Sequence, residues 1–180
     1  MSQAEFWKLV EEARVAAGRV LDVPKQLIAK LKVRSPAEIV GFEEALHAVY
    51  SKAFDLRLWA ASTLVLRYCS DDVFYDFRGW LIAQGQAVFE KVLSNPENLA
   101  EIDVTTGDDG KARLFYMASV ASKAYAERAG RDLGEDMPPQ RQPALLNEGV
   151  WNGEQKKLPG MFPRLFAKYG MTGDIAPVGR

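Results

Sequence analysis

Residues 70–93 read SDDVFYDFRGWLIAQGQAVFEKVL, and this stretch predicts a long amphipathic helix. Its apolar side chains recur every three or four residues from Phe74 to Val92, a spacing that places them on one face of a helix. Ser70 supplies a hydroxyl that can cap the first turn, and the two acids that follow it complement the helix dipole. We therefore expect one buried helix that continues to about Leu93.

The segments before this stretch also have helical spacing. Ser35-Pro36-Ala37-Glu38 combines a capping hydroxyl, a proline at the first helical position and a glutamate that can complete a capping box. A helix is expected to follow it to about Phe54. Apolar residues at the same spacing predict further helices over 3–20, from Pro24 onward and over 56–67.

The second half of the chain is less regular. Helical spacing returns over 112–129, after residues 103–111, which have the composition of a loop. Leu133–Pro143 contains three prolines and is expected to be irregular. Leu158–Tyr169 predicts a last short helix, with Pro163 in its first turn. Residues 171–180 are expected to form a flexible C-terminal tail.

These patterns together predict an all-α fold. Long runs of alternating polar and apolar residues are absent, and neither a repeat nor an internal boundary is visible. The chain has 180 residues, of which 48% are hydrophobic and 26% charged, as in ordinary globular proteins. We therefore expect a compact, single-domain multi-helix bundle over 1–170.

Charge and cysteine content argue against several classes of function. The 23 basic and 24 acidic residues leave a net charge of -1, so we expect no nucleic-acid partner. No segment has the apolar length of a membrane span and the N-terminus does not resemble a signal peptide, so no membrane association and a cytoplasmic location are expected. Cys69 is the only cysteine and His47 the only histidine, which excludes an internal disulfide and a cysteine–histidine zinc site.

Several stretches resemble a bacterial family of uncharacterised proteins, domain-of-unknown-function family 4240. The central one is residues 69–85, CSDDVFYDFRGWLIAQG, and it is supported by Glu5-Phe6-Trp7, residues 55–61 and residues 158–165. The resemblance extends to about Tyr169 and implies a compact helical domain with no established reaction, cofactor or ligand. Relatives commonly carry Asn and Gly just before the cysteine.

This chain departs from that pattern, because Leu66, Arg67 and Tyr68 precede Cys69. If the small polar residues of the relatives contribute to a site, that site is altered in this protein.

Three aspartates form the first candidate site. Asp72 and Asp76 are four residues apart and can face the same way on a helix, while Asp71 lies at its start. Three carboxylates suit a hard cation such as Mg²⁺. Acids in a first turn also simply stabilise the helix dipole, and no metal or other cofactor is therefore assigned.

Arg78 and Gln84 form the second candidate site, because both polar side chains lie among residues that should be buried. A buried guanidinium requires a carboxylate or carbonyl partner, and Asp71, Asp72 or Glu43 could supply one. Such a pair could serve only to hold the helices together. Alternatively, Arg78 and Gln84 line a pocket for an anionic or amide-bearing ligand, with Trp80 as its wall.

Signatures of catalysis are missing from the sequence. It contains no glycine-rich phosphate loop, no G-x-S-x-G motif and no H-E-x-x-H motif. Cys69 precedes the start of a predicted helix, which would lower the pKa of its thiol, yet no base lies beside it in sequence. A small thiol in the core is the simpler interpretation.

The sequence favours a non-enzymatic module that binds a protein or a small molecule. The predicted recognition surface consists of Asp71, Asp72, Asp76, Arg78, Trp80 and Gln84. The alternative is an enzyme of unknown reaction that uses the aspartates with Mg²⁺, or Arg78 as a clamp for an anion. Oligomeric state is not predicted.

Overall fold

The computed structural model describes residues 1–104, 117–138, 140 and 143–170, and within them the protein is all-α, as predicted. Its helices are α1 (Gln3–Ala17), α2 (Val23–Leu31), α3 (Pro36–Lys52), α4 (Leu56–Leu66), α5 (Asp71–Ala83), α6 (Gln86–Ser94), α7 (Val120–Ala129), α8 (Leu158–Met161) and α9 (Pro163–Tyr169). Short 3₁₀ helices are η1 (Val20–Asp22), η2 (Pro96–Glu101), η3 (Leu133–Glu135) and η4 (Gln155–Lys157).

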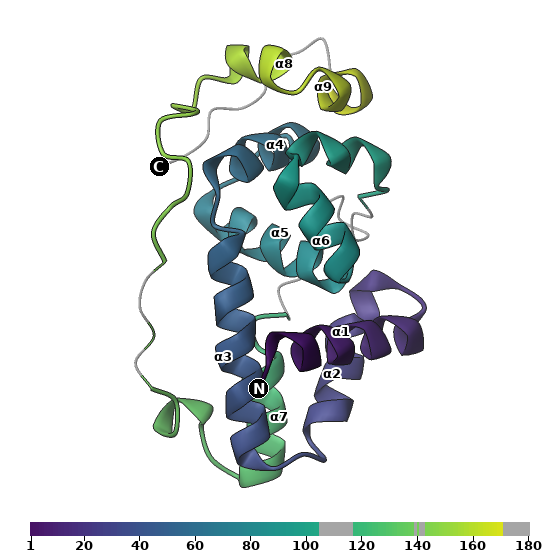
Figure 1. The fold of residues 1–180 in the computed structure, drawn as a ribbon, viewed down its shortest axis with the longest axis vertical. Coiled ribbons are helices and arrows are strands. Elements are labelled where there is room, and N and C mark those ends of the chain that lie inside the picture. The colour runs from purple at the N-terminus through teal and green to yellow at the C-terminus, as the bar shows by residue number, and fades with distance from the viewer. Residues whose placement is uncertain (105–116, 139, 141–142, 171–180) are drawn as a thin grey trace.

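The long helix α3 connects the two ends of the domain (Figure 1). At one end α1 packs against α2, and both α2 and α3 pack against α7. At the other end α4, α5 and α6 lie together, and α9 packs against α4 and η2. The elements share one core that includes Phe42 from α3, Leu58 from α4 and Trp80 from α5. A single domain results, in agreement with the sequence.

The capping bonds predicted from the sequence form at the N-terminal ends of α3 and α5. The Ser35 hydroxyl accepts from the backbone N–H of Glu38, and the Glu38 carboxylate accepts from the backbone N–H of Ser35, so the capping box of α3 is complete. The Ser70 hydroxyl caps α5 by accepting from the backbone N–H of Val73. These bonds satisfy backbone donors that have no partner inside the helix.

The helix predicted over 71–93 is in fact two helices. Gly85 has φ of 92°, a backbone conformation that side chains with a Cβ rarely adopt, and it separates α5 from α6. Apolar residues keep their helical spacing from α5 into α6. The spacing alone therefore did not predict that the helix is interrupted at Gly85. Gln84 consequently lies at the C-terminal end of α5 instead of inside a helix.

The later predictions are met in part. α7 occupies 120–129 of the helix predicted over 112–129, and residues 112–116 lie outside the described part of the chain. The last predicted helix is divided into α8 and α9, with Pro163 in the first turn of α9. The predicted tail at 171–180 and most of the predicted loop at 103–111 also lie outside the described residues.

Residues 143–154, which precede η4, run along the domain toward α8 (Figure 1). This segment is attached at the junction of α3 and α4, where Leu56 N–H donates to the Leu146 carbonyl at 3.0 Å and Leu146 N–H donates to the Phe54 carbonyl at 2.8 Å. The buried Asp55 carboxylate accepts from the Asn147 side chain at 2.5 Å. These bonds hold the segment beside the C-terminal end of α3.

α4 ends at Arg67, which has φ of 67° in the left-handed region. Left-handed backbone costs a residue with a Cβ about 1–2 kcal/mol, and helix ends of this kind usually carry glycine or asparagine. Asn or Gly, which the family resemblance implies near this position, would adopt this backbone conformation with little strain.

Arg67→Gly is expected to raise the free energy of unfolding by about 1 kcal/mol, because glycine adopts this conformation without strain. Gly130→Ala is the matched control: Gly130 ends α7 with φ of 70°, so the same physics predicts a loss of similar size. Urea unfolding of both variants measures the two changes. A destabilised Arg67→Gly variant contradicts the strain argument.

Candidate functional site

A cavity of about 300 Å³ lies between α3 and α5. α3 contributes Glu43, His47 and Tyr50 to its walls, and α5 contributes Tyr75 and Arg78. The other lining residues are Leu46, Ser51, Phe54, Ala118 and Pro143. Ligand pockets in proteins typically enclose about 300–1,000 Å³ and combine apolar walls with a few polar groups, a description that this cavity fits at its lower limit.

The residues at the α3 side of the cavity form one helical stripe. Glu43, His47, Tyr50 and Phe54 follow one another at intervals of four, three and four residues, and this spacing repeats on one side of a helix. On α5, Phe74 and Tyr75 precede Arg78 by four and three residues, so the same rule places them beside its guanidinium. The cavity is the place where these two stripes face each other.

Arg78 is the charged residue at the centre of this arrangement, and it is only 7% exposed. Nη1 donates to the backbone carbonyl of Tyr50 at 3.0 Å. Cζ lies 5.0–5.4 Å from the ring centroids of four aromatic residues, and these are Tyr50, Phe54, Phe74 and Tyr75. The rings provide a cation–π environment that partly replaces water.

Within the described part of the chain, the charge of Arg78 nevertheless has no counter-ion. No carboxylate of the described residues forms an ion pair with it, and its buried Nε has no hydrogen-bond partner among them. Burial accordingly lowers the pKa of the guanidinium below its ordinary value. A buried cation normally has a carboxylate partner, because desolvating an unpaired charge costs several kcal/mol.

Glu43 is the acidic residue among the described residues that line the cavity. Its buried Oε2 has no hydrogen-bond partner in the described residues, and burial raises the pKa of this carboxyl from 4.5 to about 7. Glu43 is therefore far easier to protonate near neutral pH than an ordinary carboxyl group. A protonated carboxyl can donate a hydrogen bond, whereas a carboxylate only accepts.

Two tyrosines accompany the acid and the cation at this cavity. The rings of Tyr50 and Tyr75 are stacked, with centroids 4.8 Å apart and planes at 23°. The Tyr50 hydroxyl is buried without a partner among the described residues, and burial raises the pKa of this phenol well above its usual range. Tyr75 is 43% exposed, so it forms the solvent side of the site.

Two of the residues expected to accompany Arg78 lie elsewhere. Trp80 is fully buried in the core, where its ring centroid is 5.4 Å from that of Phe77, and its Nε1 has no hydrogen-bond partner in the described residues. Gln84 lines a different cavity of about 640 Å³, beside the Glu11–Arg14 ion pair. A helix turns about 100° per residue, so side chains two and six positions after Arg78 point in other directions.

The three aspartates line neither the cavity at Arg78 nor the cavity at Gln84. Asp71 and Asp72 are exposed in the first turn of α5, where acids stabilise the helix dipole, and Asp76 is partly buried. In the described part of the chain, no group of three His, Cys, Asp or Glu residues is arranged to hold a metal ion.

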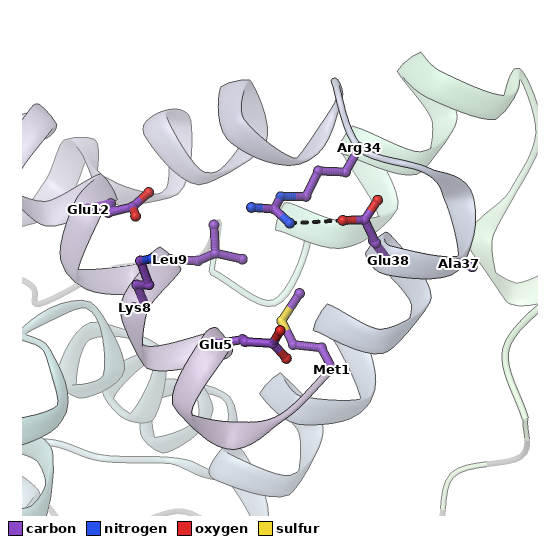
Figure 2. A pocket seen from close by; sticks show the side chains of 8 residues that line it. All are labelled: Met1, Glu5, Lys8, Leu9, Glu12, Arg34, Ala37 and Glu38. Atoms are coloured by element: carbon purple, nitrogen blue, oxygen red, sulfur yellow. Dashed lines mark hydrogen bonds and ion pairs between the residues drawn. The ribbon is translucent and has the colours of Figure 1, made fainter.

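A third cavity of about 460 Å³ lies between α1 and the start of α3 (Figure 2). Four of its charged groups have partners near the surface: Arg34 pairs with Glu38 at 2.9 Å, Glu5 accepts from Ser2, and Glu12 pairs with Lys30. This surface therefore contrasts with the cavity at Arg78, where Arg78 Nε and Glu43 Oε2 are buried without a hydrogen-bond partner among the described residues.

Cys69 is a core thiol. Its Sγ lies 3.1 Å from the Ser62 hydroxyl, and burial raises the pKa of the thiol to about 12. The expected lowering by the neighbouring helix start is thus wrong, because burial outweighs the helix dipole. A thiol that stays protonated at neutral pH is a poor nucleophile.

Sequence comparison identifies the family of this domain. The family model described as "Protein of unknown function (DUF4240)" matches residues 1–127, which include both stripes of the cavity.

The chain belongs to the DUF4240 family.

The match contains the resemblance seen at residues 69–85, whereas residues 158–165 lie beyond it. No curated protein and no solved structure matches this chain. None of the helices described for this DUF4240 protein has the length and apolar character that crossing a bilayer requires.

Three residues of the cavity, Tyr50, Phe54 and Tyr75, were not predicted from the sequence to belong to a site. Their spacing relative to Glu43 and Arg78 is the signal that groups them. The pairing of the two stripes depends on how α3 packs against α5, which no local pattern specifies.

Glu43→Gln in this DUF4240 protein is expected to increase stability at pH 8 relative to the natural chain. The folded protein holds the Glu43 proton more tightly than the unfolded chain, so the contribution of Glu43 to stability falls as pH rises from about 4.5 through about 7, and the loss is complete once the group is ionised in both states. The full difference corresponds to about 3 kcal/mol, and the amide introduced by the substitution cannot ionise.

Urea unfolding at pH 4.5 and pH 8 measures this effect as the change, between the two pH values, in the stability difference of the two proteins. Glu44→Gln is the control, because Glu44 is exposed and adjacent in sequence. A stability difference that does not grow with pH contradicts an ionisable, buried Glu43.

Proposed function

We propose that this DUF4240 domain is a small-ligand-binding module, and that the cavity between α3 and α5 takes an anionic small molecule. One observation carries the proposal: Arg78 is buried at the wall of a cavity, with an unpaired Nε and no ion pair to any carboxylate of the described residues. Of the six residues predicted from sequence, the proposal retains Arg78 as the one that contacts the ligand.

The energetic argument is that Arg78 carries a buried positive charge for which the described residues supply no negative partner. A hydrogen bond that involves a charged group contributes about 1.5–3 kcal/mol, and a buried group left unpaired loses this amount. An anion that enters the cavity supplies the missing acceptor in surroundings where water screens poorly. Binding sites are where uncompensated polar groups of this kind are expected.

A second candidate function is an enzyme that holds an anionic substrate with Arg78. The observation favouring it is Glu43, whose pKa of about 7 suits a general acid or base at neutral pH. Both residues line the same cavity. Conversion of a bound anion by the natural protein, and its loss in Glu43→Gln with binding retained, distinguishes the enzyme from the binding module.

Ligand binding is tested by a thermal-shift panel of small carboxylates, inorganic phosphate and phosphorylated metabolites. An anion present at about a hundred times its Kd stabilises the folded state by about 2.7 kcal/mol. For a chain of this size the Tm should then rise by about 5–10 °C. We expect Arg78→Met to abolish the shift.

The matched control is Arg34→Met, which removes a guanidinium from the cavity between α1 and α3 and should leave the shift unchanged. Arg78→Met should stay folded and lose less than about 3 kcal/mol, because it removes one charged hydrogen bond but also a desolvated charge. No shift with any anion, or shifts that persist in Arg78→Met, would falsify the proposed function.

A further inference from the structure

Residues 143–151, which we call the strap, run beside the cavity between α3 and α5. Pro143, the first residue of the strap, is one of the residues that line the cavity. Further along, Leu146 N–H donates to the carbonyl of Phe54, which lines the cavity as well. The strap therefore borders the cavity directly, through Pro143 and through its bond to Phe54.

Hydrogen bonds attach the middle of the strap to the start of α4. Leu146 exchanges backbone hydrogen bonds with Phe54 and Leu56, at 2.8 and 3.0 Å. Leu56 is the first residue of α4, where the helix itself offers its N–H no partner, so the Leu146 carbonyl supplies the missing acceptor. The Asn147 side chain donates to the buried Asp55 carboxylate at 2.5 Å. We call these three bonds the latch.

Packing adds little to the latch. Residues 144 and 146–150 are exposed, and the apolar residues Leu146 and Val150 among them are 44% and 47% exposed. Trp151, by contrast, is buried and fixes the far end of the strap. Segments with few buried apolar contacts open locally at a smaller free-energy cost than the whole domain. We therefore expect the strap to open while the helices stay folded.

The polar atoms at the cavity are covered while the strap is closed. Nε of Arg78, Oε2 of Glu43 and the hydroxyl of Tyr50 each expose less than 1 Å². A solute can contact Arg78 Nε only after one wall of the cavity has moved. The walls formed by α3 and α5 belong to helices that share the hydrophobic core, whereas displacement of the strap between its ends leaves that core in place.

We infer that the strap is a gate: the latch keeps the cavity closed, and its opening admits small molecules to the guanidinium of Arg78. Opening itself requires no ligand, whereas the role of the gate in ligand entry rests on the proposed function. The bond from Asn147 to Asp55 is the part of the latch that a substitution removes alone. Asp55 keeps its other role without that bond, because its carboxylate also accepts from the backbone N–H of Arg57 and caps α4.

Asn147→Gly tests the latch. Asn147 has φ of 57°, a conformation that glycine adopts without strain, so the substitution removes the side-chain bond and keeps the backbone conformation accessible. Glycine also gives the open strap more conformational freedom. Glu148→Gly is the matched control for that effect, because Glu148 is exposed, adjacent in sequence and not bonded to Asp55.

Amide hydrogen exchange of the full chain, followed residue by residue at neutral pH, measures strap opening. The N–H groups of Leu56 and Leu146 should exchange at least about tenfold faster in Asn147→Gly than in Glu148→Gly, because only the first variant loses a hydrogen bond to a charged group. Trp59 N–H, which donates to the Asp55 carbonyl in the first turn of α4, should exchange at the same rate in both variants and in the natural chain.

Methylglyoxal, a small dicarbonyl compound that forms covalent adducts with guanidinium groups, measures access to the cavity. Peptide mass mapping follows the adduct at Arg78, with the more exposed Arg34 as the internal reference. The rate at Arg78 relative to Arg34 should increase by about the same factor as the exchange rates, again in Asn147→Gly relative to Glu148→Gly. Both measurements then report the population of the open strap.

Each measurement can overturn the inference. Equal exchange of Leu146 in the two variants overturns the latch. Faster exchange without faster modification of Arg78 overturns the gate, because molecules then enter by another route, such as rotation of the half-exposed Tyr75 side chain.

The proposed function fails in a different way, because neither measurement depends on a bound anion. Its failure is the absence of any thermal shift with the anion panel. In a chain that binds no anion, faster exchange together with faster modification of Arg78 supports the strap as the route into the cavity and leaves the proposed function overturned.

Discussion

Arg78 of α5 places a positive charge in the interface with α3, and the neighbouring residues contact its guanidinium on several sides. One of its N–H groups binds a carbonyl near the end of α3, and four aromatic rings enclose its centre. Neither interaction neutralises the charge. Among the described residues no carboxylate balances this charge, and the ligand that we propose would supply the missing negative charge.

The position of the cavity depends on bonds made at some distance from it. The backbone pairing of Phe54 and Leu56 with Leu146, and the bond from Asn147 to Asp55, fix the chain that leads from Pro143 past the end of α3. Gly85 ends α5 shortly after Arg78 and turns the chain into α6. These constraints place the two stripes opposite each other.

Glu43 and Arg78 share one cavity without pairing, and burial shifts the pKa of each group toward its neutral form. A direct ion pair would have produced the opposite shifts, because each charge would stabilise the other. The arrangement keeps an acid close to neutrality at the pH of most cells. This property suits a residue that donates a proton or a hydrogen bond to a ligand, and it does not contribute to stability.

The sequence by itself determined the helical elements and the burial of Arg78, because capping residues and the spacing of apolar side chains are local signals. It also identified the family. The break at Gly85, the burial of Trp80 in the core and the separation of Gln84 from Arg78 were decided by tertiary structure. Which residues meet Arg78 depends on how α3 packs against α5, and packing between distant segments leaves no signature within either one.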